Sequence, residues 1–128
     1  MNESPGKIKN FTDLIAWQEA QKLALGIYKI TAGFPKDEQY SLVNQMRRAA
    51  VSITSNIAEG FSRNSYKEKI QFYSIAQGSV TELQSQLLIS KDLYYISIND
   101  FEKMFGQSTS THKIINGLIK GARKINND

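Results

Sequence analysis

The sequence predicts an all-α protein, an antiparallel up-down bundle of four helices. Three observations lead to this expectation. Apolar residues recur at intervals of three and four along most of the chain's 128 residues, as they do on the buried face of an α-helix. Turn residues divide this pattern into four segments of about 20 residues each. The connections between the segments are short, which favours antiparallel neighbours.

The chain is predicted to form one domain with short polar ends. Residues 1–10 are polar and contain Pro5 and Gly6, so we expect a disordered lead. Residues 11–125 form the predicted bundle, and residues 126–128 form a tail. No internal repeat or low-complexity tract indicates a second domain, and the length fits a single core.

The first predicted helix begins at Phe11, with Thr12 or Asp13 as its N-cap. Its apolar residues cover two adjacent faces, which is wider than a single neighbouring helix would bury. We therefore expect two neighbours in the bundle, or one of them from another subunit. The helix ends before Pro35, because proline cannot continue it.

The second helix is predicted from about Asp37 to Glu59, with Gly60 as the residue that ends it. The acids in its first turn suit the helix dipole. Its apolar side chains form one continuous seam, which we expect to face the core. The residues of this seam are Val43, Met46, Ala50, Ile53 and Ile57.

A capping box starts the third helix, because Ser65 can accept from the amide of Glu68 while Glu68 reaches back. This helix continues to about Leu93. The fourth helix is predicted to start at the N-cap Asn99 and to reach about Ile125. Because glycines weaken its second half, we expect fraying in the last turns, from residue 121 onward.

Composition and charge exclude several classes of protein. The chain has no cysteine, so disulfides, thiolate metal sites and thiol nucleophiles are excluded. No run approaches the roughly 18 apolar residues of a membrane span, and the chain does not start with an apolar signal segment. We therefore expect a cytoplasmic protein with no membrane partner. The net charge of +4 modestly favours an anionic partner.

Polar side chains follow the second and third helices where apolar side chains would otherwise meet. If these helices are antiparallel neighbours, Glu82 can approach Arg48, and the hydroxyl and amide groups can bond one another. On the third helix these polar positions lie between Ile75, Ile89 and Leu93, inside a predicted seam. We interpret them as a structural layer that sets helix register, and the functional alternative is a polar pocket. This polar layer comprises Arg48, Ser52, Asn56, Ser79, Glu82 and Gln86.

The sequence offers little for catalysis or metal binding. His112 is the only histidine, and no acid or second ligand accompanies it at helical spacing, which favours a surface or core-edge imidazole. The acids Glu59 and Glu82 are too few for a magnesium cluster. There is no glycine-rich phosphate loop and no serine with a histidine base. We therefore expect a non-enzymatic protein with no catalytic residue, metal or cofactor.

Basic residues gather after the second helix and late in the fourth. In an antiparallel bundle these two regions lie at the same end, where they would attract the phosphates of RNA or DNA. The alternative is that cations near a helix C-terminus suit the helix dipole and solubility. The candidate nucleic-acid-binding residues are Arg63, Lys67, Lys69, Lys113, Lys120, Arg123 and Lys124.

Three segments of the chain resemble a known family. They are FTDLIAWQEAQKLALGIYKIT, FPKDEQYSLVNQMRRAAVSITSNIAEG and FYSIAQGSVTELQSQLLIS, so the likeness runs roughly from Phe11 to Tyr95. On these residues the chain resembles the small bacterial four-helix-bundle proteins first noticed as products of intervening sequences in 23S rRNA genes. Relatives include the accessory variability determinant of diversity-generating retroelements.

The resemblance implies an up-down bundle that assembles into a homopentamer and has no catalytic residue. It also implies a basic surface for RNA or DNA and, in the retroelement relatives, a reverse transcriptase as protein partner. We expect the oligomer to form through the wide apolar arc of the first helix and one face of the second, with Trp17, Arg47 and Val51 in the interface. The predicted function is binding of RNA or DNA by the assembled ring. The alternative is a protein-binding scaffold or accessory subunit that makes no direct nucleic-acid contact.

Overall fold

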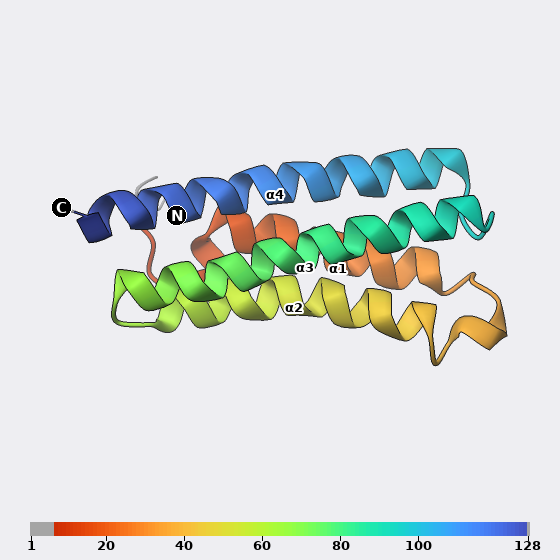
Figure 1. Ribbon diagram of the computed structural model, residues 1–128, viewed down its shortest axis with the longest axis horizontal. Helices are drawn as coiled ribbons and strands as arrows, with labels where there is room; N and C mark the ends of the chain where they lie inside the picture. The colour runs from red at the N-terminus through yellow and green to blue at the C-terminus, as the bar shows by residue number, and fades with distance from the viewer. Residues whose placement is uncertain (1–6, 128) are drawn as a thin grey trace, which may run out of the picture.

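The computed structural model of the protein describes residues 7–127. Two short 3-10 helices, η1 Phe11–Asp13 and η2 Lys36–Glu38, precede the first and second long helices. Consecutive long helices run antiparallel along the longest axis of the molecule (Figure 1), and the described residues contain no strand. The predicted all-α, up-down four-helix bundle is confirmed. The long helices are α1 Ile15–Thr31, α2 Leu42–Ser62, α3 Tyr66–Asp92 and α4 Ile98–Asn127.

The described residues include part of the predicted lead and part of the predicted tail. Residues 1–6 of the expected lead and Asp128 of the expected tail lie outside the described residues. Inside them, Lys7–Asn10 are exposed. The other two residues assigned to the tail, Asn126 and Asn127, belong to α4.

The core lies along the bundle axis, where α1 and α3 each pack against both α2 and α4. The predicted seam of α2 is confirmed, because its five residues from Val43 to Ile57 are at most 1% exposed. Burying one large apolar side chain contributes about 1.5–3 kcal/mol. Fully buried side chains of the other helices meet this seam: Leu23 and Ile27 of α1, Leu83 and Leu87 of α3, and Ile115 of α4.

The first two long helices begin later than predicted. Asn10 rather than Thr12 or Asp13 is the first N-cap, since its side chain accepts from the amide of Thr12 at 2.9 Å. This cap starts η1, and α1 follows at Ile15. Before α2, the acids expected in its first turn lie instead in η2.

The predicted end of α2 at Gly60 is wrong, because the helix continues through this residue to Ser62. Gly60 is buried, and a Cβ placed on it would lie 2.7 Å from Cε1 of Tyr73 on α3. Glycine is therefore required here for close approach of two helices, and a left-handed turn is not the reason for it.

The predicted N-cap residue of α3 is correct, whereas that of α4 is not. Ser65 caps α3 as predicted, with the amide of Glu68 donating to its hydroxyl oxygen at 3.1 Å, but the Glu68 carboxylate accepts from the Ser65 hydroxyl and not from its amide. For α4, the hydroxyl of Ser97 rather than the side chain of Asn99 accepts from an amide of the first turn, that of Asp100, at 3.0 Å.

Helix α4 continues past Lys120, where fraying was expected, and ends at Asn127. Buried side chains hold its second half against the bundle, among them Ile115, Ile119 and Ala122. Tertiary packing therefore overrides the low helix propensity of Gly117 and Gly121.

The long helices differ in length. With 17 residues, α1 spans about 25 Å, whereas the 30 residues of α4 span about 45 Å. At the end of the bundle that holds the C-terminus, α3 and α4 extend past the start of α1 (Figure 1).

Candidate functional site

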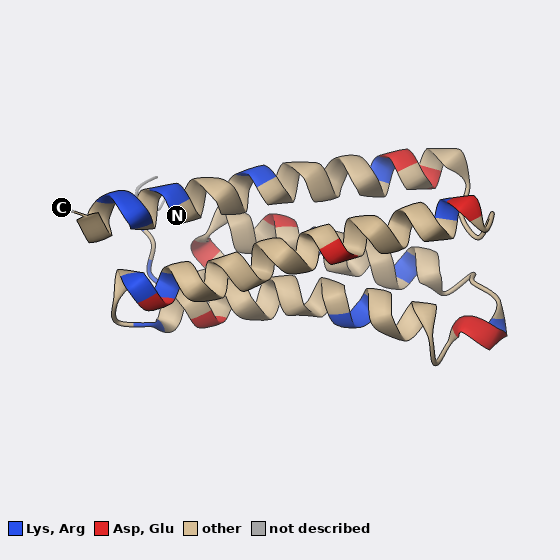
Figure 2. Cartoon of the chain, viewed as in Figure 1, with Lys and Arg blue, Asp and Glu red and all other residues tan. Residues whose placement is uncertain are grey.

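The basic regions predicted to converge do lie at one end of the bundle. The loop between α2 and α3 and the last turns of α4 share the end where the C-terminus lies (Figure 1). Lysines and arginines from the start of α3 and the end of α4 gather there (Figure 2). We call this region the basic end.

Two of the seven candidate cations are engaged within the chain. Arg63 Nη2 lies 2.7 Å from Glu59 Oε2, and its guanidinium lies over the ring of Phe72 at 4.6 Å. Lys69 Nζ donates to the backbone oxygen of Phe61 at 2.7 Å, and burial lowers the pKa of this amine. Both residues close the C-terminal end of α2, which favours the alternative interpretation that such cations satisfy a helix end. We therefore remove both from the candidate interface.

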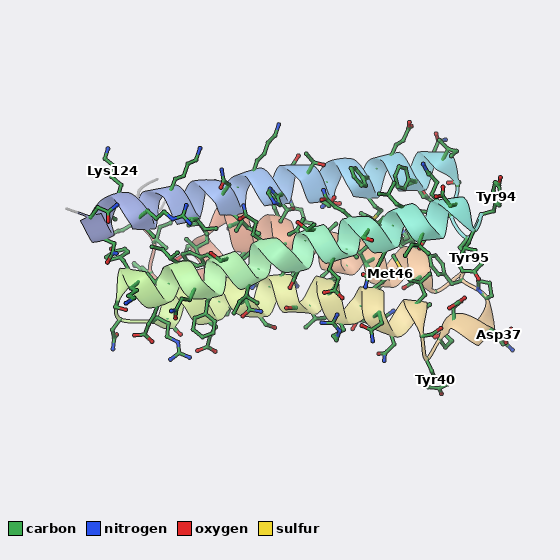
Figure 3. The ribbon with its side chains drawn as sticks, in the orientation of Figure 1. Asp37, Tyr40, Met46, Tyr94, Tyr95 and Lys124 are labelled. Carbon is green, nitrogen blue, oxygen red and sulfur yellow. The ribbon has the colours of Figure 1, made fainter. Side chains whose placement is uncertain are left out.

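The other five cations remain exposed, and no carboxylate of residues 7–127 lies within ion-pair distance of them. Lys113, Lys120 and Lys124 recur at helical spacing and share one face of α4. The side chain of Lys124 points away from the bundle (Figure 3). We call these residues the free cations: Lys67, Lys113, Lys120, Arg123 and Lys124.

The polar layer forms most of the contacts expected across α2 and α3. Arg48 Nη2 contacts Glu82 Oε2, and the hydroxyl oxygens of Ser52 and Ser79 are 2.9 Å apart. Gln86 Nε2 donates to Glu82 Oε2 at 3.2 Å. The remaining member, Asn56, bonds within α2 instead, donating to a backbone oxygen one turn earlier.

The polar layer is less buried in one chain than the sequence indicated. The side chains of Arg48 and Glu82 are 52% and 39% exposed. An exposed ion pair of this kind contributes about 0–1 kcal/mol, so removing either partner should cost little in the single chain. The neighbouring Ile75, Ile89 and Leu93 are 52%, 47% and 48% exposed. Ser79 and Gln86 are 8% and 9% exposed, so the expected seam is buried at these two polar positions, whereas its three apolar residues form a surface strip of α3.

The three residues expected in the oligomer interface differ in whether their side chains are engaged in contacts within the chain. The ring of Trp17 packs edge-on against Phe11 at 5.4 Å. Arg47 joins α2 to α1, because its Nε donates to Thr31 Oγ1 at 3.0 Å and its guanidinium lies 4.5 Å from the ring of Tyr28. Val51 is 42% exposed and is the one of the three that faces outward without such a contact in the described structure.

An apolar groove of about 530 Å³ opens at the basic end. Its walls come from the start of α1, the start of α3 and the last turns of α4, with Ile8 of the lead along one side. It lies where α3 and α4 extend past α1. We call it the end groove; sequence reasoning missed it, because its existence depends on the different lengths of helices that are distant in the chain.

Features typical of metal or membrane proteins are not found in the described part of the chain. Between residues 7 and 127, no three side chains of the His, Cys, Asp and Glu types come together as a metal site would require. No helix in this range combines the length and hydropathy needed to cross a bilayer. The single histidine, His112, is half-buried on α4.

Fold and surface together define a small antiparallel four-helix bundle with a basic end. A family model described as 23S rRNA-intervening sequence protein matches residues 12–117. The chain therefore belongs to the 23S rRNA-intervening sequence protein family, as the resemblance of its segments predicted.

A solved structure from Bacteroides thetaiotaomicron VPI-5482 has a similar fold. It is described as a protein with unknown function from the S23 ribosomal protein family, and it superposes with a TM-score of 0.77 at 21% identity. The alignment covers 83% of this chain and 96% of that one. At this identity the likeness shows the fold alone. A search of curated proteins gives no match.

Proposed function

We propose that the protein is a non-enzymatic homo-oligomer, a ring of five copies, that binds RNA or DNA through the free cations of the basic end. The observation that carries the proposal is that these five residues are exposed and have no carboxylate partner within residues 7–127. Cations free of internal partners are available to replace the counterions of phosphates. Repeating the set around a ring would sum contacts that are weak individually.

Two separate strips of exposed apolar side chains support the oligomer. One strip lies on α1 and α2, with Leu25, Tyr28 and Val51 from 42% to 62% exposed. The other is the strip on α3 formed by Ile75, Ile89 and Leu93. A cyclic ring joins two different faces of each subunit, so two unlike apolar surfaces suit it.

The nucleic-acid proposal is tested by the salt dependence of binding to a labelled RNA hairpin and a DNA duplex. In the variant carrying Lys120→Gln and Lys124→Gln we expect weaker binding, with the slope of log K against log salt reduced by about 2, or about 1 for each lost phosphate contact. Fluorescence anisotropy from low to physiological salt measures this slope.

The matched control is Lys103→Gln, which removes an exposed lysine from the other end of α4 and should leave the slope unchanged. Wild-type binding that does not respond to salt would overturn the proposal. The same holds if Lys103→Gln acts like the double variant, because location at the basic end would then be irrelevant.

A protein-binding role is the second candidate function, and the end groove favours it. An apolar groove gives a nucleic acid few hydrogen bonds, whereas apolar side chains of a protein can fill it. Retention of a partner protein after nuclease treatment would support this function over direct binding of nucleic acid.

A further inference from the structure

The end groove lies at the end of the bundle where α1 is absent beside α3 and α4. Elsewhere α1 covers the seam between the other helices, but at the basic end it stops while α3 and α4 continue (Figure 1). The groove lies in this gap and is lined mainly by aliphatic side chains, including Leu14, Ile15, Ile114, Leu118 and Ile125. Ile15 and Ile125 are 64% and 51% exposed, so nothing in the described chain covers them fully.

Two glycines of α4, Gly117 and Gly121, face the same groove. They lie one turn apart on the helix, and a Cβ placed on either would have no atom within 4 Å. Gly26, in contrast, packs within the chain, because a Cβ there would lie 2.7 Å from Cε of Met104 and this side chain would have to move. Packing among residues 7–127 therefore does not explain Gly117 and Gly121, although both lower helix propensity. Their bare backbone lets another segment approach α4 closely.

The charged residues around the groove indicate the sign of the charge that its occupant should carry. Exposed cations adjoin its lining residues in the chain: Lys7 and Lys9 flank Ile8, and Lys67 follows Tyr66. The one acid in the lining, Asp13, already accepts from the backbone amides of Lys9 and Asn10 at 2.9 and 3.1 Å. These bonds lower the pKa of Asp13 and compensate its charge. The groove therefore favours an occupant with acidic flanks.

We infer that the end groove binds the apolar face of an acidic amphipathic helix from a protein partner. Such a helix would continue the line of α1, place apolar side chains from successive turns on the aliphatic walls and pass close to Gly117 and Gly121. Acids on its flanks would be attracted to the lysines that adjoin the lining residues in the chain. Two tyrosines also line the groove, but Tyr73 is only 4% exposed, so an unpaired base would find a single accessible ring to stack on, that of Tyr66, whereas most of the lining is aliphatic and suits this occupant.

The inference goes beyond the proposed binding of nucleic acid, and it can fail while that proposal stands. The test is selection of binders from a displayed library of helix-forming peptides of about 15 residues, a length at which isolated helices become stable. We expect the selected peptides to carry Leu or Ile at helical spacing together with Asp or Glu. Their affinity for purified variants of the full chain is then measured by anisotropy.

The decisive variant is Gly117→Leu, which fills the groove, and the matched control on the same helix is Gly106→Leu. Both positions have open space around a Cβ, but only Gly117 lines the groove. We expect the selected peptides to lose about tenfold or more in affinity for Gly117→Leu and to bind Gly106→Leu like the wild type. Circular dichroism checks the fold, and Gly121→Ala repeats the test with a smaller addition.

Four outcomes would overturn the inference. The library could yield no binder, or the selected peptides could be basic instead of acidic. Peptide binding could be unaffected by Gly117→Leu and Gly121→Ala. Finally, these variants could reduce RNA binding or the sedimenting mass instead, which would assign the groove to a nucleic acid or to a second copy of the chain.

Discussion

At Gly60 the absence of a side chain sets the distance between α2 and α3. A Cβ there would lie 2.7 Å from Cε1 of Tyr73 and 3.1 Å from Cβ of Phe72. Because the ring of Tyr73 is only 4% exposed, it has little room to move. We expect Gly60→Ala to lower the free energy of unfolding by about 1–3 kcal/mol, the usual cost of overpacking. Urea denaturation followed by circular dichroism measures it.

The control is Gly106→Ala, where the new methyl group meets no atom within 4 Å. This change should raise stability by up to about 1 kcal/mol, because alanine favours the helix. If both substitutions stabilise the protein, the close contact at Gly60 does not constrain the fold.

The stability of the protein at acid pH depends in part on Glu38, whose carboxylate contacts a residue that is distant in the chain. Its carboxylate accepts from Ser41 Oγ at 2.6 Å and from Tyr95 Oη at 2.8 Å. These two hydrogen bonds, that of Ser41 first, hold the pKa of Glu38 below its ordinary value. A lowered pKa contributes stability that is present above the unfolded-state pKa and is lost as the pH falls through the folded-state pKa.

Tyr95→Phe removes one of these hydrogen bonds, so the pKa of Glu38 should be lowered less. The melting temperature of the variant should therefore decrease less than that of the wild type between about pH 6 and about pH 3. The matched control is Tyr94→Phe, since Tyr94 is 92% exposed and points away from the bundle (Figure 3). Thermal unfolding across this pH range measures the effect. Equal curves for wild type and Tyr95→Phe would contradict the role given to this hydrogen bond.

At the scale of one element, the start of α3 depends on a single side chain. The hydroxyl of Ser65 accepts from the amide of Glu68 at 3.1 Å and so satisfies a donor with no partner inside the helix. We expect Ser65→Ala to cost about 1 kcal/mol of the free energy of unfolding. Ser74→Ala, an exposed position inside the same helix, is the control and should be neutral or slightly stabilising.

For the whole molecule, assembly should depend on the apolar strip of α3. Ile89→Glu introduces a charge into this strip, where it would be desolvated in an interface but remains in water on a single chain. We expect sedimentation to show the variant near the 14.5 kDa of one chain, with its helical content unchanged, while the wild type sediments as a larger species. Ile98→Glu, at an exposed isoleucine outside both strips, should leave the assembly intact. A wild type that is monomeric at micromolar concentration would refute the oligomer.

Much of the fold could be predicted from the sequence. The four helices, the buried seam from Val43 to Ile57 and the N-cap Ser65 follow from residues within one or two turns of each other. The convergence of the basic regions at one end also followed, because antiparallel order places alternate connections together (Figure 2). Helix starts were less certain, as at Asn10 and Ser97, where several neighbouring residues could serve as caps.

By itself, then, the sequence determined the class of fold, the face that α2 buries and the end where the cations gather, since these depend on local periodicity and chain order. Only the tertiary structure decided that Gly60 serves helix contact, that Lys69 donates to the backbone at the end of α2, and that the pair of Arg48 and Glu82 is half exposed. It also revealed the end groove, which exists because α1 is shorter than the helices beside it. These features depend on contacts between different helices, and no periodic pattern within one helix encodes those contacts.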